Sequence, residues 1–448
     1  MDRLERERNF KALVTLAIPV ILEQILTTLL QYVDTAMVGR LGPAATSSVS
    51  LTTSVNWLIG NVFAAVGIAF VAIISSAYGA GTKEKISRVS SQSILYITVL
   101  GIAVSAVAVG LSPFIPIWMQ ADAEIQRQAS IYFAIISAPI LFRSSSIICA
   151  SALRAVKDTR TPMVINLIAN VLNVGLNYLL IYTAGLGVTG AAIATAVSSV
   201  LSGGALFFCM MRNPILDCRF RGLRFDRNVY KETVRIALPA MATSTTSCLG
   251  HVVFASLVSS MGTTVFAAHS IALSSETIFY LPGYGLRSAT STLIGISVGE
   301  NDKDKFRVVE RQSVILTVAM MTFTGIMLFL FARPIMAIFT PDAEVIRQGA
   351  KVLKLIAVSE PLFGLMIVSE GIYYGLGQTK VTFIVETIGS WGIRILFTTI
   401  CVKVLHTTLF EVWMCMFADN AFRALAMAIP LFSGRDLRYF EKRRKGML

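Results

Sequence analysis

Charge is scarce in this 448-residue chain, where Asp, Glu, Lys and Arg together make up 15% of the residues. Soluble domains usually carry roughly 25% charged residues. Hydrophobic residues reach 55% here, and the mean hydropathy is +0.69. Metal-binding residue types are also rare: there are three histidines and six scattered cysteines without a CxxC pair. The composition predicts a polytopic membrane protein and indicates neither a metal centre nor a disulfide framework.

The sequence between Lys11 and Leu201 repeats itself 220 positions later. Four separated motifs keep this register, pairing residues 17–19 with 237–239, 41–42 with 261–262, 79–85 with 299–305, and 122–124 with 342–344. One register across four motifs indicates a duplicated chain. Apolar chains made of two related halves are typical of secondary transporters, in which the substrate site lies between the repeats.

A transmembrane helix needs roughly 20 mostly apolar residues, and the chain contains twelve such stretches. They lie near residues 13–36, 46–76, 90–112, 129–150, 162–183, 189–211, 236–259, 265–297, 312–332, 348–375, 381–402 and 410–432. Six spans in each copy make the repeats parallel, related by an axis along the membrane normal. We therefore predict an all-α membrane protein with twelve transmembrane helices in two six-helix bundles related by a pseudo-two-fold axis.

The net charge of +13 is concentrated on one side of the predicted membrane topology. Basic residues gather before the first span, after the second, fourth and eighth spans, in the stretch 212–235, and from residue 435 onward. The positive-inside rule places these segments in the cytoplasm. We predict an N-terminal bundle over residues 1–211, a cytoplasmic linker over 212–235, and a C-terminal bundle with a basic tail over 236–448. The protein is expected in the cell membrane with both termini cytoplasmic.

Three motifs in order along the duplicated chain resemble the multidrug and toxic compound extrusion (MATE) transporters. They are residues 33–42 (VDTAMVGRLG), 153–160 (LRAVKDTR) and 190–195 (GAAIAT). The resemblance covers nearly the whole chain. It implies export of organic, often cationic, compounds driven by inward flow of sodium ions or protons, with no other cofactor.

A carboxylate at membrane depth is costly and is a functional candidate by default, and Asp34 lies near the end of the first span. Asn170, Asn173 and Asn177 share one face of the fifth span; the alternative for these amides is hydrogen bonding between helices. The resemblance assigns a cation site to Asp34, Asn173, Asn177 and Thr195, with Na⁺ as a possible ligand. Relatives of the archaeal branch often have Asp where Asn177 stands, which leaves the choice between sodium and proton open.

Pro19 lies inside the first span, where proline removes a backbone hydrogen bond and favours a bend. The resemblance implies that this helix bends when Asp34 is protonated. In the C-terminal half, the sodium-coupled branch of the family carries carboxylates at two positions, which correspond here to Ser247 and Phe363. The resemblance therefore does not extend to that branch's C-terminal ion site.

Glu276 resembles an acidic residue of many bacterial relatives. We predict that it contacts cationic cargo, as the one carboxylate in the middle of a C-terminal span. Its repeat counterpart is the uncharged Asn56. Aromatic and Met side chains are candidate cavity residues because they suit lipophilic cations, with ordinary helix packing as the alternative; they are Tyr280, Met241, Trp57, Phe63 and Phe279. Roles for Glu370 and Glu386 are left open.

Two other functions fit the sequence less well than export of organic cations. A lipid-linked saccharide flippase of the same superfamily needs a strongly cationic cavity, whereas the mid-span charges here are mostly acidic. A membrane enzyme is the least favoured, because the chain has no HExxH motif and no clustered His or Asp constellation. The expected partners are small organic cations and membrane lipid, without nucleic acid, and the expected state is a monomer.

Overall fold

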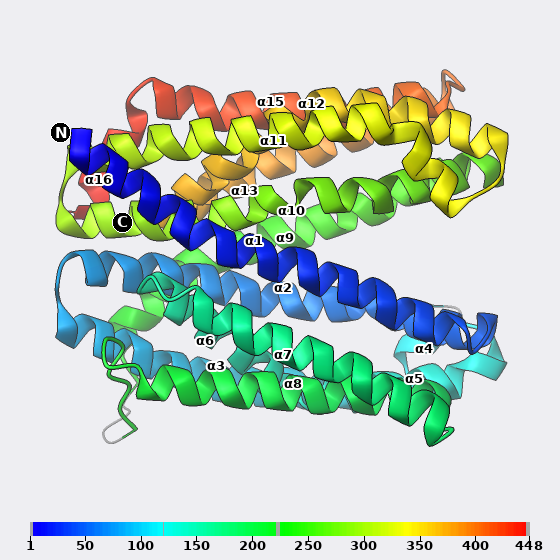
Figure 1. Ribbon diagram of the computed structural model, residues 1–448, viewed down its shortest axis with the longest axis horizontal. Coiled ribbons are helices and arrows are strands. Elements are labelled where there is room, and N and C mark those ends of the chain that lie inside the picture. The colour runs from blue at the N-terminus through cyan, green and yellow to red at the C-terminus, as the bar shows by residue number, and fades with distance from the viewer. Residues whose placement is uncertain (1–2, 120, 221–224, 445–448) are drawn as a thin grey trace. The chain divides into compact units, whose positions relative to one another are not determined.

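A computed structural model describes residues 3–119, 121–220 and 225–444 of the chain, which are almost entirely helical (Figure 1). Residues 221–224 of the predicted linker and 445–448 of the basic tail lie outside the described residues. The helices of the first half are α1 (Arg3–Gly39), α2 (Pro43–Gly79), α3 (Lys83–Leu111), α4 (Ile115–Trp118), α5 (Ala123–Ser137), α6 (Ile140–Ala155), α7 (Arg160–Asn177), the π-helix η1 (Tyr178–Thr183) and α8 (Gly187–Arg212). Those of the second half are α9 (Arg227–Ser259), α10 (Thr263–Glu300), α11 (Lys303–Phe339), α12 (Ala343–Leu376), α13 (Thr379–Thr387), the π-helix η2 (Ile388–Ile395), α14 (Leu396–Lys403), α15 (Leu409–Phe432) and α16 (Arg435–Arg444).

Each of the twelve predicted spans coincides with a helix or a run of joined helices. Among the described residues, ten helical spans are long and apolar enough to cross a membrane. The pair α5 and α6, bent by 48° at its break, makes an eleventh. The remaining predicted span is α10, a continuous helix of 38 residues that carries Glu276 and Arg287 in its interior. The chain is a multi-pass helical membrane protein.

The repeat is visible in the backbone at the start of the second helix of each half. Gly42 and Gly262, which are 220 positions apart, precede α2 and α10 with φ angles of 108° and 118°. Only glycine adopts such angles at no steric cost. The two copies therefore enter their second helix through the same turn.

The chain divides into two compact units, residues 22–237 and residues 1–21 with 238–448. The division falls inside α1 and inside α9, close after Pro19 and close before Pro239. These limits differ from the predicted ones at 211 and 236, because the first part of α1 packs with the second half of the sequence. Likewise the first part of α9 packs with the first half.

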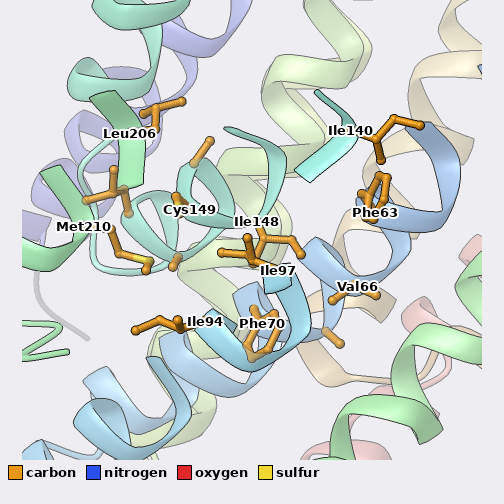
Figure 2. Close-up of a cluster of buried hydrophobic side chains, with 14 of the residues drawn as sticks. Phe63, Val66, Phe70, Ile94, Ile97, Ile140, Ile148, Cys149, Leu206 and Met210 are labelled. Atoms are coloured by element: carbon orange, nitrogen blue, oxygen red, sulfur yellow. The ribbon is translucent and has the colours of Figure 1, made fainter. Parts of the chain in front are cut away.

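The core of the unit 22–237 is an apolar cluster formed by α2, α3, α6 and α8. Figure 2 shows Phe63, Phe70, Ile97 and Ile148 converging in it, and all four are at most 3% exposed. Phe63 is one of the candidate cavity residues, and it is fully buried in this cluster. The alternative of ordinary helix packing holds for this side chain.

Close helix crossings in this unit depend on small residues, as is common in membrane proteins. A Cβ atom on Gly203 of α8 would lie 2.0 Å from the backbone oxygen of Phe142 in α6. On the same helices, the Ser145 hydroxyl donates to the Gly203 carbonyl at 3.0 Å. The backbones of α6 and α8 therefore touch at this point, which brings the polar side chains of α8 close to those of α6.

Candidate functional site

The face of α1 beyond Pro19 is joined to α7 by three hydrogen bonds of identical register. Asn166 donates to Glu23 at 2.7 Å, Asn170 donates to Thr27 at 3.0 Å, and Asn177 donates to Asp34. Each pair is 143 positions apart, so the two helices run in parallel and stay level. We call these three hydrogen-bonded pairs the rungs between α1 and α7. They extend over eleven residues, or about 16 Å of helix. The predicted amide stripe on the fifth span therefore lies against the first span.

The four residues of the predicted cation site lie together at one end of these rungs. Besides its bond to Asp34, the Asn177 amide contacts the Asn173 side-chain oxygen at 3.3 Å, and the Asn173 amide contacts the Thr195 hydroxyl at 3.5 Å. Asn177 is fully buried, and its side-chain oxygen has no hydrogen-bond partner within the described part of the chain. Carboxylate, amide and hydroxyl oxygens are the kind of oxygen ligand that hard cations prefer.

A break in helix geometry follows this cluster directly. The α-helix α7 ends at Asn177, and the π-helix η1 begins at Tyr178. Short π-helical segments are rare and occur frequently at functional sites, because they change the direction in which side chains point. The local backbone thus singles out Asn177 independently of its hydrogen bonds.

A cavity of about 500 Å³ opens beside the rungs within the unit 22–237. Its lining from α1, α5, α6, α7 and α8 is mostly polar and includes Asp34, Asn173 and Thr195. At the other end of the rungs Glu23, 7% exposed, forms an ion pair of 2.7 Å with Arg154. Asn166 links this pair to Ser202 at 2.7 Å.

The second unit contains a carboxylate that sequence reasoning missed. Glu360 of α12 is 1% exposed and Glu276 of α10 is 8% exposed. One side-chain oxygen of each, Oε2, lacks a hydrogen-bond partner among the described residues. The prediction that Glu276 is the one mid-span carboxylate of this half is therefore wrong.

The register of α10 against α12 places these two carboxylates level. The Tyr280 and Phe363 rings lie 5.6 Å apart, and Arg287 pairs with Glu370 at 2.8 Å. A Cβ on Gly375 would lie 2.7 Å from the Ser291 backbone oxygen. These pairs are 83 or 84 positions apart, as are Glu276 and Glu360. Parallel helices that keep one offset over four turns bring Glu360 beside Glu276.

Glu370 and Glu386, whose roles were left open, each form an ion pair with an arginine. Glu386 lies 2.5 Å from Arg423, which also donates to Asp419 at 2.9 Å. Asp419 in turn pairs with Arg394 at 2.8 Å. All four side chains of this cluster are at most 7% exposed, and Arg394 belongs to the second π-helix, η2.

The sequence of this chain matches a known protein family in both copies of its repeat. The MatE family model matches residues 19–179 and again residues 239–400, so the same model recognises both copies of the repeat. The chain belongs to the MatE family. A probable multidrug resistance protein NorM of Thermotoga maritima is 28% identical over 430 residues, covering 95% of this chain and 92% of that protein.

Two solved structures share the fold of this MatE protein at 22% identity. Crystal structures of MATE in the straight and in the bent conformation both superpose with a TM-score of 0.89. The first covers 97% and the second 98% of each chain. Membership of the MatE family, together with relatives named multidrug resistance proteins, makes the protein a membrane transporter rather than an enzyme.

Of the candidate cargo residues of this MatE protein, Trp57 belongs to the unit 22–237, whereas Met241, Glu276 and Tyr280 belong to the other unit. Tyr280 lies one helical turn from Glu276, between Tyr284 at 5.7 Å and Phe363 at 5.6 Å. Trp57 in α2 is 49% exposed and does not line the cavity of its unit. Met241 is half-buried in α9, and Phe279 packs against the core of the second unit. Phe279 and Tyr280 both lie about one helical turn from Glu276 along α10.

One sequence match that points to a hydrolase has a structural explanation. Residues 295–299 read Gly-Ile-Ser-Val-Gly, the pattern of a nucleophile elbow between a strand and a helix. Here they lie inside α10, and the buried Ser297 hydroxyl donates to the Leu293 carbonyl at 2.9 Å. Ser297 is therefore an ordinary helical serine in this transporter.

Proposed function

We propose that this protein is a secondary antiporter that exports organic cations in exchange for sodium ions or protons. The cluster of Asp34, Asn173, Asn177 and Thr195 carries the proposal, since it unites a half-buried carboxylate with amide and hydroxyl oxygens. The named relative, a probable multidrug resistance protein, supports the choice of cargo. Cation binding at Asp34 is proposed to alternate with cargo binding, and Pro19 is proposed as the point where α1 bends. MATE structures of the same fold are known in a straight and in a bent conformation.

The experiment is dye export from proteoliposomes with sodium and pH gradients imposed separately. We expect one of the two gradients to drive export, and Asp34→Asn to abolish the driven component while the protein remains folded. Asp122→Asn is the matched control, because this aspartate is exposed at the start of α5. Wild-type rates in Asp34→Asn, or export that neither gradient drives, would contradict the proposal.

Glu276, with Glu360 level beside it, is proposed to neutralise the positive charge of the cargo. Two carboxylates with unpartnered oxygens repel one another strongly in a medium of low dielectric constant. A bound cation would relieve that repulsion. Glu276→Gln should therefore weaken binding of cationic cargo more than of neutral cargo, and Glu344→Gln, in an exposed helical turn, should change neither. Equal losses for both cargo types would assign Glu276 a structural role.

The orientation of the chain is proposed from its basic segments, with both termini and the linker in the cytoplasm. A single cysteine at the exposed Arg227, in a variant without the six native cysteines, tests this placement. An impermeant maleimide should label it only after the cells are permeabilised. Labelling in intact cells would reverse the topology.

The flippase alternative loses support from the pairing of the buried arginines. Four arginines whose side chains are at most 27% exposed have a carboxylate within ion-pair distance, namely Arg154, Arg287, Arg394 and Arg423. Their positive charge is neutralised, so they do not offer a strongly cationic surface to a pyrophosphate.

A further inference from the structure

Arg143 lines the cavity of the unit 22–237 from α6, one turn before Ser146 and Ile147, which line the same wall. Ser146 contacts Asn166 at 3.4 Å and so is level with Glu23. Arg154, which pairs with Glu23, lies farther along α6, so Arg143 is displaced from that level in the direction away from Arg154. Arg143 of α6 therefore lines the same cavity as the hydrogen-bonded residues of α1 and α7.

Arg143 has no carboxylate partner within the part of the chain that the structure describes. Its contacts are with one residue of α2: Nη1 donates to the Asn56 side-chain oxygen at 3.3 Å, and Nη2 donates to the Asn56 backbone oxygen at 3.1 Å. A guanidinium has five N–H donors, so these bonds leave several of them free. Arg143 is half-buried, and the four arginines named above, which are buried or half-buried, each have an acidic partner.

An arginine held in a protein interior without a counter-ion has a large desolvation cost. The repeat shows that the architecture does not require this cost. The position equivalent to Arg143 in the second copy is Phe363, 220 residues later, which packs against Tyr280. An unpaired cation retained where its counterpart is an ordinary aromatic residue indicates a binding role.

We propose that Arg143 binds an anionic group of the cargo, such as a carboxylate, inside this cavity. The proposal rests on the export function above and extends it to zwitterionic compounds. A guanidinium matches a carboxylate through two parallel hydrogen bonds, and such charge-assisted pairs are among the strongest in proteins. The cavity volume of about 500 Å³ lies within the range of pockets that enclose small organic ligands. Asp34, on the same wall as the rungs, carries the opposite charge, so the cavity presents both signs to one molecule.

The test compares two dyes that differ only at one carboxyl group: rhodamine 110, which carries a free carboxylate, and rhodamine 123, its methyl ester. Binding is measured by fluorescence anisotropy with the purified full-length protein in detergent. Wild type should bind both dyes. Arg143→Gln should weaken rhodamine 110 at least about tenfold, as expected for loss of a buried charge partner, and should change rhodamine 123 less than about twofold.

Two further variants separate recognition from folding. Arg143→Lys keeps the charge without the forked geometry and should bind rhodamine 110 with intermediate affinity. Arg40→Gln, at an exposed arginine between α1 and α2, should bind both dyes like wild type. Unchanged rhodamine 123 binding shows that each variant is folded.

Every other outcome counts against the inference. Equal losses for both dyes would make Arg143 a structural support of α2 through Asn56, and no loss for either would leave it without a role in binding. Wild-type binding of the ester but not of the carboxylate would also overturn it while leaving cation export intact. Binding of neither dye by wild type would instead contradict the proposed export function.

Discussion

Replacing Arg423 by Met tests how the buried ion cluster stabilises the C-terminal half. Arg423 joins α15 to α13, because its guanidinium lies 2.5 Å from Glu386 and donates to Asp419 at 2.9 Å. Met has a similar length without the charge. The variant would leave Glu386, which is 3% exposed, without its counter-ion, whereas Asp419 would keep Arg394 at 2.8 Å.

Breaking a buried ion pair by removing one partner costs about 3–5 kcal/mol, because the remaining charge is uncompensated. At about 2–4 °C per kcal/mol for a folded unit of this size, the melting temperature should fall by roughly 6–20 °C. Thermal unfolding of the purified protein in detergent, followed by a thiol-reactive dye, measures the change. Arg347→Met is the matched control, since the Arg347 side chain is 75% exposed in its pair with Glu344. A surface pair contributes at most about 1 kcal/mol.

The double variant Arg423→Met with Glu386→Gln separates the unpaired charge from lost packing. Neutralising Glu386 removes the stranded charge, so the double variant should be more stable than Arg423→Met alone. A double variant as unstable as the sum of the two single variants would refute this reasoning. It would mean that hydrogen bonds and packing, rather than charge compensation, hold the cluster.

Three further predictions concern individual residues. Gly203→Ala should destabilise the protein by about 1–3 kcal/mol, because its Cβ would overlap the Phe142 backbone; the neighbouring Gly204→Ala, with open space around its Cβ, should be neutral or stabilising by up to about 1 kcal/mol in the same melting assay. Asp342→Ala should cost about 1 kcal/mol, because the Asp342 side chain accepts hydrogen bonds from two backbone N–H groups at the start of α12. Burial raises the pKa of the Cys218 thiol, which lies between α8 and α9, to about 12, so at pH 8 a maleimide should label it only after unfolding; rapid labelling of the native protein, checked by mass spectrometry, would contradict this.

The helices and the grouping of Asp34 with Asn173 and Asn177 could be predicted from the sequence. Apolar runs identify spans without any knowledge of their neighbours, and the 220-residue register shows the duplication. Asn173 and Asn177 could be placed on one helical face from their spacing of four. Asp34 was assigned to the same site through the family motif, and the structure brings these residues together, whereas their role in ion binding stays a prediction.

The sequence did not predict the partners of the buried charges, because pairing depends on the register between helices. Glu23 and Arg154 are 131 positions apart, and their pairing follows only once α1 and α6 are seen to meet. Glu360 precedes a proline in an apolar run, and its pairing with Glu276 depends on the offset between α10 and α12. An ionisable residue in the middle of a predicted span was the available signal for both Glu360 and Arg143.

The two halves treat their buried charges differently, although both use parallel helices in constant register. In the second unit most of the charge is closed into arginine–carboxylate pairs that fix α13 against α15 and α10 against α12. In the first unit Glu23 also has an arginine partner. Among the described residues, however, neither Asp34 nor Arg143 has an ion-pair partner: Asp34 accepts a hydrogen bond from the Asn177 amide, and Arg143 donates to Asn56. A charge that already has a counter-ion gains little from a ligand, whereas a charge without one gains the full interaction with an ion or cargo group of opposite sign. We therefore propose that ion and cargo exchange takes place mainly in the first unit, with Glu276 and Glu360 as the second unit's contribution.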